Sequence, residues 1–156
     1  MEKAVLLGFL EVQRSAVLTI VDGLDDVALT TAVLPSKWTP LGMIEHLGYA
    51  ERFWFQTVLR GTAAEVPWPD DDHEPLNTPR PRETVFAFYA EQRALADAII
   101  DAASLDTPPK GSHRTGHDVT DLRWIILHMI EETARHAGHL DVVRELLDGR
   151  TGLAPR

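Results

Sequence analysis

The fold is decided by one segment near the C-terminal end of the chain, Trp124-Ile-Ile-Leu-His-Met-Ile-Glu-Glu-Thr-Ala-Arg-His-Ala-Gly-His-Leu-Asp-Val-Val-Arg144. Nearly every residue in it is compatible with an α-helix. Four of its side chains can bind a metal: His128, Glu132, His136 and His139. Because each residue of a helix turns the chain by about 100°, the four groups fall in a sector about 80° wide. The segment therefore predicts a helix that carries one stripe of potential ligands.

This stripe is expected to face the interior of the protein. Met129, Val143 and Leu147 lie in the same sector or beside it. Burying a carboxylate and several imidazoles among apolar side chains is costly unless a partner compensates them. A divalent metal and a hydrogen-bonded network are two such partners, and a single buried histidine is more often structural than a ligand. Glu132 and His136 together, one helical turn apart, favour the metal.

Apolar residues at helical spacing predict four long helices. They cover approximately residues 2–22, 39–59, 81–103 and 120–148. The first helix has a broad apolar stripe made of Val5, Leu6, Phe9, Leu10, Val12, Ala16, Val17, Ile20 and Val21. Thr39-Pro40 marks the start of the second, because a threonine hydroxyl caps free amides and proline fits the first helical position.

Stretches rich in proline and glycine predict long loops after helices two and three, at residues 61–80 and 104–119. The length of 156 residues is typical of one domain. We therefore predict an all-α fold, a four-helix bundle that occupies residues 1–156 as a single domain.

His46 is predicted to point inward from the second helix, because Met43 and Ala50 share its face by helical rotation. Bundles build metal sites from side chains on facing helices, so His46, Glu132 and His136 form a candidate set of ligands. Two imidazoles and one carboxylate suit Zn²⁺, and also Ni²⁺, Co²⁺ or Fe²⁺. Three protein ligands leave an open position for water, a thiolate or a substrate oxygen, as in reactive sites. The spacing differs from the His-Glu-x-x-His motif of zinc proteases.

The composition narrows the classes of function. A net charge of −9 disfavours nucleic acids and anionic membranes as partners. No signal peptide or membrane span is expected, which predicts a cytoplasmic protein. The chain contains no cysteine, which removes disulfides, thiolate nucleophiles and iron–sulfur sites. Any thiol chemistry must therefore use a thiol that comes from outside the protein.

Two motifs resemble the DinB-like superfamily of metal-binding four-helix bundles. They are SKWTPLGMIEHLGYAERFWF at residues 36–55 and LRWIILHMIEETARHAGHLD at residues 122–141. The resemblance covers essentially the whole chain. It is closest to a branch of actinobacterial proteins related to mycothiol-dependent enzymes, which include thiol S-transferases and maleylpyruvate isomerases with an N-terminal domain of this type.

The resemblance implies a pocket with three metal ligands at the positions of His46, Glu132 and His136. Most members of the superfamily have histidine at all three positions. The similar mycothiol-dependent maleylpyruvate isomerases have His, Glu and His, as this sequence does, and the glutamate makes the surroundings of the metal one charge more negative.

Three further residues are assigned from the same motifs. His139 occupies a position where relatives often have glutamine, and we interpret it as a pocket wall or a support of the ligands. Glu51 is likewise interpreted as a pocket wall or a support of the ligands. His128 matches a histidine that is frequent in the superfamily and is interpreted as structural.

The leading hypothesis is a thiol S-transferase. Zinc or another divalent metal would bind a low-molecular-weight thiol such as mycothiol, lower its pKa and present the thiolate to an electrophilic substrate. Two alternatives stay open: a metal-dependent hydrolase that uses metal-bound water, and a non-catalytic metal-binding module of a stress response. Such a bundle could also form a homodimer.

Overall fold

The computed structural model describes residues 1–62, 76–111 and 118–151, and all regular secondary structure in these ranges is helical. In chain order the elements are α1 (Glu2–Val21), α2 (Asp26–Thr30), α3 (Pro40–Glu51), the π-helix η1 (Arg52–Leu59), α4 (Arg82–Asp101) and α5 (Leu122–Asp148). The all-α prediction is confirmed. The loops predicted at 61–80 and 104–119 lie partly outside the described residues.

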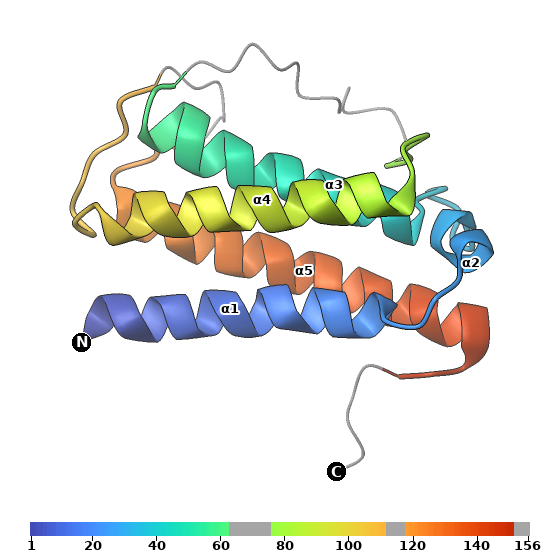
Figure 1. Ribbon diagram of the computed structural model, residues 1–156. Helices are drawn as coiled ribbons and strands as arrows, with labels where there is room; N and C mark the ends of the chain where they lie inside the picture. Colours follow the sequence, from blue (N-terminus) through green and yellow to red (C-terminus); the bar gives the residue numbers. More distant parts are fainter. Residues whose placement is uncertain (63–75, 112–117, 152–156) are drawn as a thin grey trace.

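The long helices pack in two pairs. Helix α1 packs mainly against α5, and α3 with η1 packs against α4. Figure 1 shows these segments side by side, with α1 and α5 running in the same direction. Two clusters of buried apolar side chains hold the pairs together, one around Phe55 and Ile126 and the other around Val17 and Ile44. The face of α5 that carries the candidate ligands therefore meets α3 inside the fold.

Helix α1 corrects one expectation. This helix is long and apolar enough to cross a membrane by length and composition alone, although no membrane-spanning segment was expected from the sequence. A helix that is packed into the core of a soluble protein can have the same length and apolar composition. Helix α1 buries Leu10, Val17 and Ile20 against its neighbours, and it carries the buried side chain of Arg14. These contacts make it part of the core.

Helix α3 begins where the sequence predicts. The Thr39 hydroxyl accepts a hydrogen bond from the amide of Gly42 at 3.1 Å, and Pro40 occupies the first helical position. The predicted helix 39–59 is not uniform, however, because it becomes a π-helix at Arg52. The amide of Arg60 accordingly binds the carbonyl of Phe55 at 3.3 Å. Apolar spacing does not reveal this change, since π-helices are rare and short.

We expect Thr39→Ala to lower the free energy of unfolding by about 1 kcal/mol, the usual cost of losing such a cap. The buried amide of Gly42 would lose its hydrogen-bond acceptor. Thr39→Ser keeps the hydroxyl and should retain most of the stability. Urea denaturation of the three proteins checks this, and equal losses in both variants would show that the hydroxyl is not the stabilising group.

Candidate metal centre

Three potential ligands meet between α3 and α5. His46 comes from α3, and Glu132 and His136 come from successive turns of α5. The Nε2 atoms of His46 and His136 lie 3.1 Å and 2.9 Å from the same atom, Oε1 of Glu132. All three ligand atoms lie within 4.8 Å of one another. The fold thus brings together the three side chains that the sequence analysis selected as candidate ligands.

The centre is largely enclosed and carries negative charge. His136 is buried, while His46 and Glu132 are partly exposed. Hydrogen bonds with His136 and His46 hold the pKa of the Glu132 carboxyl well below its usual range, and burial opposes them only in part. Glu132 is therefore a carboxylate at neutral pH, which is the form that binds a cation.

The spacing of the ligand atoms fits a small divalent ion. In a tetrahedral zinc site the ligand atoms lie about 2.0–2.2 Å from the metal and so roughly 3.4 Å from one another. The separations from Glu132 to His136 and His46 are 2.9 Å and 3.1 Å. A slight expansion would admit the ion. Two imidazoles and a carboxylate are also a donor set that zinc and its neighbours among the divalent metals prefer.

Trp38 packs against one side of this centre. Its ring centroid lies 5.6 Å from that of His136 and 5.3 Å from that of His139. The sequence analysis did not select Trp38 as a site residue. Its place directly before the Thr39 cap of the helix that carries His46 is the signal that could have identified it.

His139 lies beside the centre, with its ring centroid 5.9 Å from that of His136. Burial, followed by the charges of His136 and Arg135, lowers its pKa, so the ring is neutral at pH 7. The Nδ1 atoms of His136 and His139 are buried and have no hydrogen-bond partner among the described residues. His139 is not one of the three converging side chains, and its interpretation as a wall of the site stays a prediction.

His128 lies one helical turn before Glu132 and packs between two tryptophans. Its ring centroid is 4.4 Å from that of Trp54 in η1 and 5.2 Å from that of Trp124, on which it stacks. In the described part of the chain it does not join the converging set. Its ring contacts are those of a packing residue.

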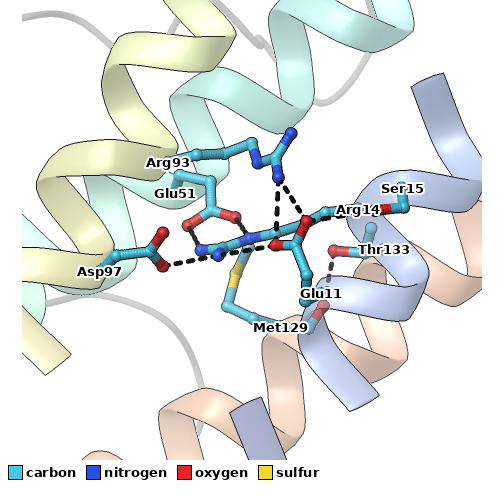
Figure 2. Close-up of polar contacts among 8 residues, drawn as sticks. All are labelled: Glu11, Arg14, Ser15, Glu51, Arg93, Asp97, Met129 and Thr133. Atoms are coloured by element: carbon cyan, nitrogen blue, oxygen red, sulfur yellow. Dashed lines mark hydrogen bonds and ion pairs between the residues drawn. The ribbon is translucent and has the colours of Figure 1, made fainter. Parts of the chain in front are cut away.

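Glu51 is buried in the core, where it pairs with Arg14. Arg14 donates from Nε and Nη2 to the two oxygens of Glu51, each at 2.7 Å, and from Nη1 to Asp97 at 2.7 Å (Figure 2). The side chains of Arg14 and Glu51 are only 2% and 1% exposed. Burial raises the pKa of the Glu51 carboxyl, and the hydrogen bonds from Arg14 oppose that rise. The pair ties α1 to α3, so we assign Glu51 to the core.

A family model described as mycothiol-S-transferase matches residues 5–149. The chain belongs to this family. The match includes the whole of α3 and α5, and so all three residues of the candidate centre. No curated protein and no solved structure matches the chain. Membership confirms the resemblance to mycothiol-dependent enzymes, and the mycothiol-S-transferase family implies small-molecule partners, a thiol and its substrate.

Proposed function

We propose that this chain is a mycothiol S-transferase that depends on a divalent metal, with His46, Glu132 and His136 as the protein ligands. The observation that carries the proposal is the meeting of two imidazole Nε2 atoms at one carboxylate oxygen, 3.1 Å and 2.9 Å away. We propose zinc as the metal, because two nitrogen ligands and one oxygen ligand with an open position are typical of its reactive sites. The helices would hold these ligands as part of a DinB-like four-helix bundle.

The amino-acid composition explains why a thiol from outside the protein is needed. The protein has no cysteine, so mycothiol must supply the nucleophilic sulfur. A divalent ion at the centre would lower the pKa of a thiol that binds to it. Glu132 and the two histidines would position that ion, and Trp38 would restrict the rings of His136 and His139 through its contacts with both. The sulfur would then form a bond to an electrophilic carbon, the bond from that carbon to its leaving group would break, and the leaving group would depart as an anion while the thiol proton passes to solvent.

A conjugation assay tests this proposal. Purified protein loaded with zinc is mixed with mycothiol and an electrophile such as a bromobimane or chlorodinitrobenzene, and the thioether is measured over time. We expect turnover above the uncatalysed rate only when both the metal and mycothiol are present, and we expect a chelator to remove it.

Cysteine, supplied in place of mycothiol, is the matched control for the thiol. Turnover that is equal with both thiols would argue against a mycothiol enzyme. If the zinc-loaded protein gave no thiol-dependent turnover, the transferase proposal would be wrong. Hydrolysis of an activated ester without any thiol would favour the hydrolase instead.

A further inference from the structure

Two ring nitrogens beside the candidate metal centre are buried without a hydrogen-bond partner among the described residues. They are Nδ1 of His136 and Nδ1 of His139. The two residues are three positions apart on α5, so their side chains are neighbours on the helix surface. A buried polar atom without a partner is uncommon and costs free energy. Two such nitrogens side by side therefore point to a contact between them.

The place of His136 in the centre determines which nitrogen is the donor. Nε2 of His136 points to Oε1 of Glu132 at 2.9 Å, so this nitrogen is the one that would bind the metal. An imidazole that binds a metal through Nε2 carries its hydrogen on Nδ1 and usually donates it to a neighbouring acceptor. His139 can be that acceptor, because a neutral imidazole with its hydrogen on Nε2 has a free lone pair at Nδ1.

The positions of the two rings favour a direct contact. Their centroids lie 5.9 Å apart, and their planes are inclined by 43°. With Nδ1 of each ring turned toward the other, a small approach of the rings brings the two nitrogens to the hydrogen-bond distance of about 2.9–3.0 Å. Both nitrogens are buried from solvent, so the neighbouring ring is a better placed acceptor than a water molecule.

We propose that Nδ1 of His136 donates a hydrogen bond to Nδ1 of His139 when the metal centre is occupied, which makes His139 the positioning residue of this ligand. The inference rests on the proposed function only in taking Nε2 of His136 as a metal ligand. The slight expansion that admits the ion moves the ring of His136 away from Glu132, and His139 lies on that far side, further along α5. The hydrogen bond fixes the tautomer and the direction of the His136 ring and makes Nε2 a stronger ligand.

Trp38 holds the two rings together. Its ring centroid lies 5.6 Å from that of His136 and 5.3 Å from that of His139. Lys37, directly before it, has a φ of 60°, which is uncommon for a residue with a side chain and tends to occur at functional sites. The amide of Lys37 donates to the carbonyl of Leu34 at 2.9 Å and closes the turn. This turn places the indole against both imidazoles, where it keeps water from the hydrogen bond between them.

Calorimetric titration of the full chain with zinc tests the proposal. His139→Leu removes the acceptor, and we expect it to raise the zinc dissociation constant about 10- to 100-fold, the usual effect of losing the partner of a metal-bound imidazole. His139→Gln supplies a carbonyl oxygen as acceptor and should recover most of the affinity, which separates the hydrogen bond from packing. His128→Leu is the matched control, because this ring of α5 packs between Trp54 and Trp124. It should keep the wild-type dissociation constant.

Nuclear magnetic resonance observes the hydrogen bond itself. In the zinc-loaded full chain, labelled with the heavy nitrogen isotope, the Nδ1 proton of His136 should exchange slowly with water. It should also transmit a scalar coupling between Nδ1 of His136 and Nδ1 of His139. In His139→Leu the same proton should exchange fast.

The outcomes separate this inference from the proposed function. Wild-type zinc affinity in His139→Leu, or a His136 proton without coupling to His139, would overturn the inference and leave the three ligands standing. Equal losses of affinity in His139→Leu and His139→Gln would assign the effect to packing and would also overturn it. A wild-type protein that binds no zinc would overturn both this inference and the proposed function.

Discussion

Replacing His136 with alanine should remove the metal from the protein and abolish thiol transfer. His136 contributes one of the two imidazole nitrogens that, among the described residues, converge on Glu132. Loss of a residue that merely supports a ligand already costs 10- to 100-fold in metal affinity, so we expect the loss of a ligand to exceed about 100-fold. Calorimetric titration with zinc and elemental analysis of the purified variant measure this effect, and the conjugation assay measures its consequence.

His128→Gln is the matched control for that experiment. His128 lies on the same helix and one turn from Glu132, but it packs between Trp54 and Trp124 and lies outside the converging set. The His128→Gln protein should bind zinc with wild-type stoichiometry, even where its free energy of unfolding is lower than that of wild type. If His136→Ala retained its zinc while His128→Gln lost it, the ligand assignment would be wrong.

Arg14→Met should destabilise the fold by about 3–5 kcal/mol, the usual cost of removing one partner from a buried ion pair. Two of the three 2.7 Å hydrogen bonds of Arg14 go to Glu51 inside the core, and the loss of Arg14 leaves that carboxylate buried. The double variant Arg14→Met, Glu51→Leu removes both charges and should recover much of the loss. Asp26→Asn breaks only the exposed pair with Arg82 and should cost less than about 1 kcal/mol.

The same variant should show a pH dependence. Burial already raises the pKa of Glu51 in the folded protein, and without Arg14 nothing of comparable strength opposes that rise. A group with a raised pKa in the folded state contributes stability below its unfolded pKa of about 4.3, and this contribution is lost as the pH rises toward the folded value. Arg14→Met should therefore be less stable, relative to wild type, at mildly alkaline pH than at mildly acidic pH. Chemical denaturation across this range checks it, and a difference independent of pH would mean that Glu51 does not titrate.

The sequence predicted the helical class and placed Glu132 and His136 on one face of α5, because both inferences depend on local spacing. Glu132 and His136 are four residues apart, so any helix through them puts both on one face. The inward direction of His46 followed from its apolar neighbours in the same way. That His46 would meet α5 rested on the general rule that bundles build metal sites from facing helices and on the resemblance to a known family, since helical rotation does not determine which helices pack together.

The residues that sequence reasoning missed depend on contacts between distant segments. Arg14 lies among apolar neighbours on α1, and its partners Glu51 and Asp97 come from two other helices. The ion pair of Glu51 with Arg14 was accordingly not predicted. The broad apolar stripe of α1 was also read as one surface, whereas the structure buries Leu10 and Val17 and exposes Phe9 and Val12. Helical spacing alone does not tell which part of so wide a stripe is packed and which part is exposed.

We propose that His46, Glu132 and His136 hold one divalent ion with a position left for the sulfur of mycothiol. X-ray absorption spectroscopy at the K edge of the metal in the purified protein tests it most directly. We expect two imidazole nitrogens and one carboxylate oxygen at about 2.0–2.2 Å from the metal, with a sulfur ligand at about 2.3 Å once mycothiol is added. A metal without imidazole ligands, or a spectrum that does not change in His46→Ala, would contradict it.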